Sequence, residues 1–219
     1  QTCALPICYG PIEDLYLEYN TLNWYGVIFR VSLTQQAEIK RMTIRGNILD
    51  GKDSFFRTKV PDLAADISLI QMSGIIPFWE SIIVENNTLL NGCRGISIYQ
   101  TDSQSISTLE VKDITFRHNN LTQSILIKVY SPYSIMTDIL IVNNTFEDSD
   151  LIVMNQTVNI ESLYIRNNQF TARQRLAYGV TSEFSNSVNM NIKGIEIINN
   201  TFQGELPGGI FMIYFQTNH

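Results

Sequence analysis

The chain has 219 residues, of which 44% are hydrophobic and 11% aromatic, so it contains enough apolar material for a large core. Its 15 Lys and Arg against 21 Asp and Glu give a net charge of −6, which argues against a nucleic-acid partner because such surfaces require clustered basic residues. Two His and three Cys leave few zinc ligands, and apolar runs such as residues 209–215 are far shorter than the ~20 residues of a membrane span. We therefore expect no cofactor and no membrane-spanning segment.

The first residues do not resemble the rest of the chain. Residues 1–7 read Q-T-C-A-L-P-I, which matches the translation of a widely used sequencing-adapter end, and the junction falls in the codon of Cys8. We interpret residues 1–8 as an adapter artefact. Residues 9–219 are expected to form a single domain that is a fragment of a longer repeat array.

One motif recurs along the rest of the chain, for example as SIIVENNTL from Ser81 and DILIVNNTF from Asp138. Five and three residues before a fixed asparagine the side chain is always apolar, and two residues after it stands Leu or Phe. Strict alternation into a turn predicts a half-buried strand. The fixed asparagines, 24 to 40 residues apart, are Asn20, Asn47, Asn87, Asn119, Asn144, Asn168 and Asn200.

A second strand is predicted to follow five of the seven asparagines. The segments are rich in β-branched and aromatic residues, which fit a pleated surface better than a helix. They are residues 26–31, 95–99, 124–130, 150–154 and 209–215.

The run IIVENNTLLNGCRGISI at residues 82–98 resembles the coils of right-handed parallel β-helix proteins of the pectin-lyase-like superfamily, and especially the non-catalytic β-helix stretches of ciliate and other protist surface proteins. The resemblance covers residues 14–215. It implies an all-β, right-handed parallel β-helix of about seven coils. The alternative is a leucine-rich-repeat solenoid, because residues 160–170 also fit L-x-x-L-x-L-x-x-N-x-L.

In a β-helix like positions stack on like, ~4.8 Å apart. We expect the fixed asparagines to form an internal amide ladder, since an unpaired buried amide would cost ~1–3 kcal/mol. Two residues earlier an outward column alternates in sign over its first four members and is expected to control register: Glu18, Arg45, Glu85, Arg117, Val142, Arg166 and Ile198. A second outward column, with Tyr16, Ile83, Leu140 and Tyr164, is expected to form an apolar stripe or to stack against sugars.

Candidate catalytic residues are weak. Pectin-lyase-like hydrolases resembling polygalacturonases would show N-T-D, D-D, G-H-G and R-I-K elements, and none occurs in this sequence. The one dense acidic group, Glu147, Asp148 and Asp150, is interpreted as a solvated turn with Arg117 as a neighbour, and calcium binding is the alternative. His118 is expected at the surface and Cys93 as an ordinary thiol. We assign no catalytic residue and no metal ligand.

The sequence predicts a non-catalytic extracellular or cell-surface repeat module that serves as a structural spacer, an adhesion surface or a glycan-contact surface. Its partners would be carbohydrates, other surface proteins and further coils of the same chain. The alternatives are a polysaccharide lyase or hydrolase of the pectin-lyase-like superfamily and a leucine-rich-repeat recognition domain. Five N-x-[ST] motifs are possible N-glycosylation sites, and none coincides with the ladder: Asn86, Asn120, Asn143, Asn155 and Asn199.

Overall fold

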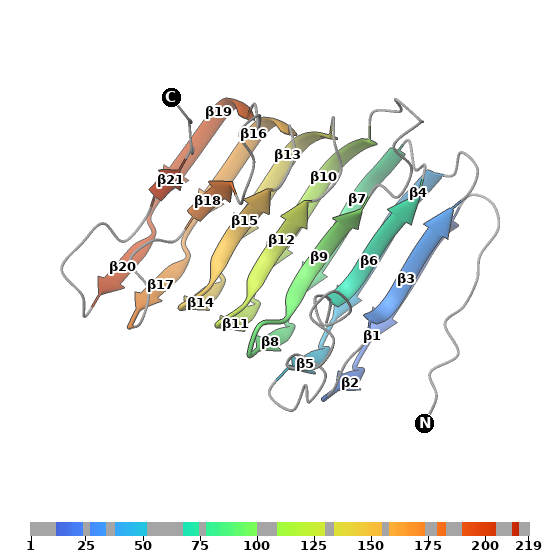
Figure 1. Ribbon diagram of the computed structural model, residues 1–219, viewed down its shortest axis with the longest axis horizontal. Coiled ribbons are helices and arrows are strands. Elements are labelled where there is room, and N and C mark those ends of the chain that lie inside the picture. The colour runs from blue at the N-terminus through green and yellow to red at the C-terminus, as the bar shows by residue number, and fades with distance from the viewer. Residues whose placement is uncertain are drawn as a thin grey trace.

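A computed structural model describes residues 12–23, 27–33, 38–51, 68–74, 78–99, 109–129, 134–154, 158–173, 179–182, 190–204 and 212–214. These residues form three parallel sheets of seven strands each. Every third strand belongs to the same sheet, so three consecutive strands make one coil of a parallel β-helix. We refer to the coils as coil 1 (β1–β3) to coil 7 (β19–β21). Figure 1 shows the coils side by side in chain order from blue to red.

Sheet A contains the longest strands, which carry the predicted alternation. They are β1 (Ile12–Glu18), β4 (Glu38–Arg45), β7 (Phe78–Glu85), β10 (Leu109–Arg117), β13 (Ser134–Val142), β16 (Val158–Arg166) and β19 (Met190–Ile198).

Sheet B contains short strands that begin directly after the ladder asparagine. They are β2 (Thr21–Leu22), β5 (Ile48–Asp50), β8 (Thr88–Leu90), β11 (Asn120–Thr122), β14 (Thr145–Glu147), β17 (Gln169–Ala172) and β20 (Thr201–Gly204).

Sheet C contains the predicted second strands, together with β6 and β18, which the sequence analysis missed. Its strands are β3 (Val27–Leu33), β6 (Ser68–Gly74), β9 (Arg94–Tyr99), β12 (Ile125–Val129), β15 (Asp150–Met154), β18 (Gly179–Ser182) and β21 (Met212–Tyr214).

The three sheets confirm the all-β parallel β-helix and exclude the leucine-rich-repeat alternative, because each coil contributes β-strands on three sides. The described residues contain no helix, and so none that is long and apolar enough to cross a membrane. The core lies between the sheets and is built from stacked columns of like side chains. In the column two residues after the ladder, the rings of Phe146, Phe170 and Phe202 stack at 4.9 and 5.0 Å between centroids.

Each strand of sheet A contains one residue in the left-handed region, six positions before the ladder asparagine. The φ angles of these seven residues lie between 54° and 67°. The parallel pairing skips this residue on both strands, as between Glu13↔Lys40 and Leu15↔Met42, so the same left-handed kink recurs in every coil, and we refer to it as the bulge. The bulge reverses which side of the sheet the preceding residues face. The bulge residues are Asp14, Arg41, Ser81, Asp113, Asp138, Ser162 and Gly194.

Candidate functional site

The turn between sheets A and B has the same form in every coil. A residue with φ between 52° and 64° precedes each ladder asparagine and redirects the chain from one sheet to the next. Asn and Gly adopt this conformation at least cost, and they fill five of the seven positions. The turn residues are Tyr19, Gly46, Asn86, His118, Asn143, Asn167 and Asn199.

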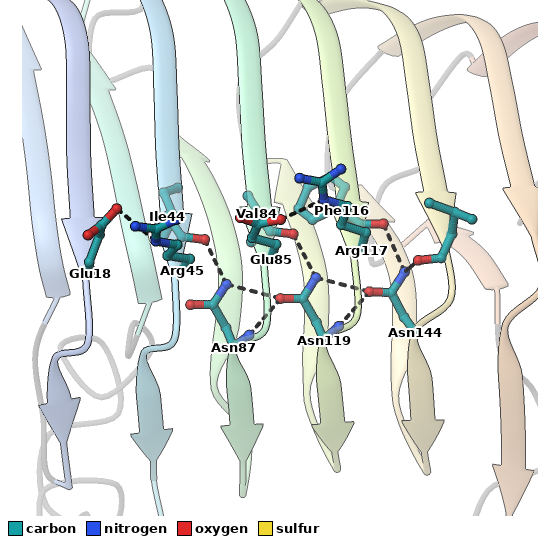
Figure 2. A network of polar contacts seen from close by, with 11 residues as sticks. Glu18, Ile44, Arg45, Val84, Glu85, Asn87, Phe116, Arg117, Asn119 and Asn144 are labelled. Carbon is teal, nitrogen blue, oxygen red and sulfur yellow. Dashed lines mark hydrogen bonds and ion pairs between the residues drawn. The ribbon is translucent and has the colours of Figure 1, made fainter.

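The ladder asparagines form a continuous chain of hydrogen bonds along the axis of the β-helix (Figure 2). Asn87 donates from its backbone N and from Nδ2 to Oδ1 of Asn119, each at 3.0 Å, and Asn119 donates in the same way to Asn144 at 2.9 Å. Nδ2 of Asn119 also donates to the carbonyl of Val84 in the preceding coil, at 2.8 Å. Each interior amide therefore has its donors and its acceptor satisfied, as predicted.

Burial along the ladder varies with position. The asparagines of coils 2 to 6 are at most 2% exposed, whereas Asn20 in coil 1 is exposed and Asn200 in coil 7 is half-buried. The interior asparagines are thus committed to structure, and their side chains are not accessible to a ligand.

The predicted charge column forms ion pairs between neighbouring coils on the outer face of sheet A. Arg45 Nε lies 2.8 Å from Glu18 Oε1, and Arg117 Nε donates to Glu85 Oε2 at 2.6 Å (Figure 2). The attraction to Glu18 raises the pKa of Arg45. Arg166 has an uncharged neighbour on each side in the column and pairs instead with Glu196, at 2.6 Å from Nε.

A second alternating column, which the sequence analysis missed, lies seven residues before the ladder. Its members are adjacent in the strand register, and Lys193 Nζ reaches Glu161 Oε1 at 3.4 Å. Strict alternation would have turned these side chains into the core, but the bulge turns them outward. The column is Glu13, Lys40, Glu80, Lys112, Thr137, Glu161 and Lys193.

The bulge residues add polar contacts to the same face. Arg41 donates from Nε to Asp14 Oδ1 at 2.7 Å and from Nη2 to Glu13 at 2.8 Å. The hydrogen bond from Arg41 holds the pKa of the Asp14 carboxyl below its ordinary 3.8, and the same bond raises the pKa of Arg41. The pKa of Lys40 is raised as well, chiefly by its hydrogen bond to Glu38.

Between the two charged columns runs the predicted apolar stripe. Tyr16 is 63% exposed and Ile83, Leu140 and Tyr164 are half-buried, all at one register position of sheet A. The stripe is interrupted by Thr43 and Thr115 and ends at Glu196. The guanidinium of Arg166 lies over the Tyr164 ring, 4.9 Å from its centroid. The outer face of sheet A therefore combines aromatic rings with flanking charges.

Glu147, Asp148 and Asp150 lie at the predicted turn into β15, but the interpretation of this turn as solvated and close to Arg117 is wrong. Asp148 and Asp150 are 3% and 9% exposed. Asp148 Oδ1 accepts a hydrogen bond of 2.9 Å from the backbone N of Arg173, whose Nη1 lies 3.3 Å from Glu147. Arg117 lies on sheet A, whereas Glu147 ends β14 in sheet B.

The turn between sheets B and C contains a shorter polar stack that the sequence analysis did not identify. Ser124 donates from its backbone N to Ser149 Oγ at 3.0 Å, and from Oγ to the carbonyl of Leu89 at 3.1 Å. Cys93, fully buried, follows the turn in coil 3 as the serines do in coils 4 and 5. The sequence feature that could have predicted this stack is a small residue five or six positions after the ladder asparagine.

His118 and four of the five N-x-[ST] asparagines lie at exposed positions. His118 is exposed at the turn, as expected. Of the N-x-[ST] asparagines, Asn86, Asn143 and Asn199 are exposed turn residues, and Asn120 is exposed in β11. Asn155 lies outside the described residues. Within the described ranges, no three His, Cys, Asp or Glu side chains are grouped so that they could hold a metal ion.

No protein-family model, curated protein or solved structure matches this chain. The sheet topology and the asparagine ladder alone assign the structure to the class of parallel β-helix repeat proteins.

Proposed function

We propose that this chain is a non-catalytic repeat module of an extracellular or cell-surface protein, akin to the β-helix stretches of protist surface proteins in the pectin-lyase-like superfamily. It acts as a rigid spacer, and the outer face of sheet A is its contact surface for glycans or other surface proteins.

The observation that carries this proposal is that the polar side chains of the ladder and of the charge column bond neighbouring coils to one another. The ladder asparagines bond to the next coil, and the Glu85–Arg117 and Glu18–Arg45 pairs join neighbouring coils in the same direction. These groups hold one coil to the next along the axis. A stack fixed in this way keeps a constant separation between whatever lies at its two ends, which is the property required of a spacer.

The stripe on sheet A supports the contact role. Tyrosine rings combine an apolar face with a hydroxyl that can hydrogen-bond, a combination suited to surfaces that are partly dry and partly hydrated. Tyr164 is held in place by the overlying guanidinium of Arg166, so its ring needs little further ordering on binding. A neutral or acidic sugar could stack on the ring and hydrogen-bond to the flanking charges.

The test is a glycan array followed by calorimetry with the best ligand. Tyr164→Ala should weaken binding about tenfold, the order of a lost ring contact of ~1.4 kcal/mol. Thr171→Ala is the matched control, because Thr171 is a half-buried residue of the same coil on sheet B. Equal effects of the two variants would refute sheet A as the contact surface.

Assays of pectate, polygalacturonate and alginate, with and without calcium, test the non-catalytic part of the proposal. We expect no cleavage. Sustained turnover by the purified protein would refute it and favour the polysaccharide lyase or hydrolase alternative.

A further inference from the structure

Three N-N-T motifs occupy one structural position on alternate coils. Asn86, Asn143 and Asn199 are the left-handed turn residues between sheets A and B in coils 3, 5 and 7, with φ of 55°, 55° and 52°. Two coil spacings of ~4.8 Å separate neighbouring members by roughly 10 Å. The three side chains therefore form a single row along one edge of the β-helix.

The two asparagines of each pair have opposite environments. Asn143 is exposed, and its side-chain amide makes no hydrogen bond within the described part of the chain. Asn144 is 2% exposed and its Nδ2 donates to Phe116 O, Val142 O and Asn168 Oδ1. A substituent on Asn143 Nδ2 would project into solvent, whereas one on Asn144 would break the ladder.

The packing of the core keeps N-x-[ST] motifs off the ladder asparagines. Two residues after each ladder asparagine stands an inward Leu or Phe, such as Leu89 or Phe146, which is fully buried. An N-x-[ST] motif on the ladder would require Ser or Thr at this core position. The outward threonine that completes the motif of the turn residue costs the core nothing.

We propose that Asn86, Asn143 and Asn199 carry N-linked glycans in one row along the edge between sheets A and B. The inference rests on the proposed extracellular location. The donor is a lipid-diphosphate-linked oligosaccharide: a bond forms between sugar C1 and the asparagine Nδ2, the C1–O bond to the diphosphate breaks, and one amide proton leaves with the diphosphate. The glycans cover this edge and leave the outer face of sheet A accessible.

In the test, a eukaryotic host secretes the chain, which is fused to a cleavable signal peptide. The reference protein, called the parent, carries Thr122→Val and Thr157→Val, which remove the motifs of Asn120 and Asn155. Intact mass before and after enzymatic removal of N-glycans should show three glycans. Thr88→Val, Thr145→Val and Thr201→Val should each remove one, without altering the turn residue.

Asn167 provides the matched gain of a site. It has the same turn position in coil 6, φ of 55° and an exposed side chain, but Gln169 follows where threonine would be needed. Gln169→Thr, made together with Thr145→Val and Thr201→Val so that the neighbouring coils are bare, should add one glycan at Asn167.

The proposal is overturned if the secreted parent has no glycan at the three turn asparagines. It is also overturned if Thr88→Val, Thr145→Val and Thr201→Val leave the number of glycans unchanged, because the sugars would then be attached at other residues. The readout is sugar mass. Ligand binding by unglycosylated protein tests the proposed contact surface separately, so either idea can fail alone.

Discussion

Asn144→Ala removes one side chain from the middle of the ladder, where the lost bonds can be counted. Oδ1 of Asn144 accepts from the backbone N and from Nδ2 of Asn119, both at 2.9 Å. Its Nδ2 donates to Phe116 O at 2.9 Å. Truncation therefore leaves two donors of Asn119 and the carbonyl of Phe116 without these partners, at a site only 2% exposed.

Each buried group without a partner costs ~1–3 kcal/mol. Three such groups exceed the usual effect of a point mutation, but a water molecule can enter the space of the lost amide and satisfy some of them. We expect Asn144→Ala to lower the free energy of unfolding by about 3 kcal/mol. Asn20→Ala, at the exposed end of the ladder, should cost less than half as much.

Asn143→Gly is the matched control. It removes the neighbouring side chain at a left-handed φ of 55°, which glycine adopts without strain, and should change stability by no more than ~0.5 kcal/mol. Urea denaturation of unglycosylated protein measures all three variants. A cost below ~1 kcal/mol for Asn144→Ala, or an equal cost for Asn143→Gly, would refute the reasoning, since neither the burial nor the bonds of the ladder would then matter.

Three further predictions concern charge, space and protonation. Glu85→Arg should destabilise by ~1 kcal/mol, and adding Arg117→Glu should restore most of the loss; a double-mutant cycle without coupling would show that the two side chains do not pair. Gly46→Ala should cost ~1–2 kcal/mol for its left-handed φ and more than Gly194→Ala, because the new methyl would lie 2.5 Å from a ring carbon of Tyr19 and the exposed ring must move away. Gly194→Ala, with a similar φ but its nearest atom at 3.7 Å, should cost only ~1 kcal/mol, and equal costs would contradict this account. In an NMR titration Arg41→Gln should raise the pKa of Asp14 toward its ordinary 3.8, and an unchanged pKa would contradict the hydrogen-bond assignment. Because the folded-state pKa of Asp14 is lowered, the stability that it contributes is present above its ordinary pKa and is lost as the pH falls through the folded value.

The ladder and its flanking columns could be predicted from the sequence because they depend on near neighbours. Apolar residues five and three positions before the asparagine face inward by simple alternation, and Leu or Phe two positions after it begins the core of sheet B. The charge column two positions before the ladder follows by the same count. From the bulge to this charge column a period of two places every residue correctly, and the left-handed turn residue then shifts the phase by one, so that the asparagine faces inward.

The rest of sheet A could not be placed in this way because the bulge breaks the period. Trp79 and Ile82 both face the core although they lie three positions apart, because Ser81 between them has φ of 58°. The available signal was Asp, Ser or Gly at six of the seven bulge positions, always six residues before the ladder asparagine. The acidic group was misread for a related reason: the folding of Asp148 over the backbone of Arg173 depends on a neighbouring coil, 25 residues away in the sequence.

The two charged columns on sheet A change sign together from one coil to the next. This shared alternation determines whether the charges can set the register of the strands or the order of the coils. Coil 1 presents Glu13 and Glu18 and coil 3 presents Glu80 and Glu85, whereas the corresponding pairs are Lys40 and Arg45 in coil 2 and Lys112 and Arg117 in coil 4.

Each of these strands thus carries one sign at both positions and each neighbour carries the other. A slip of two residues along a strand would lose the ion pairs but would not set like charges against one another. A change in the order of the coils would do so, and like charges directly opposite are destabilising by a similar ~0.2–1 kcal/mol for each pair. The asparagine ladder, whose amides find no acceptor after a slip, fixes the register. The alternating charges, which we expected to control the register, instead favour the order of the coils.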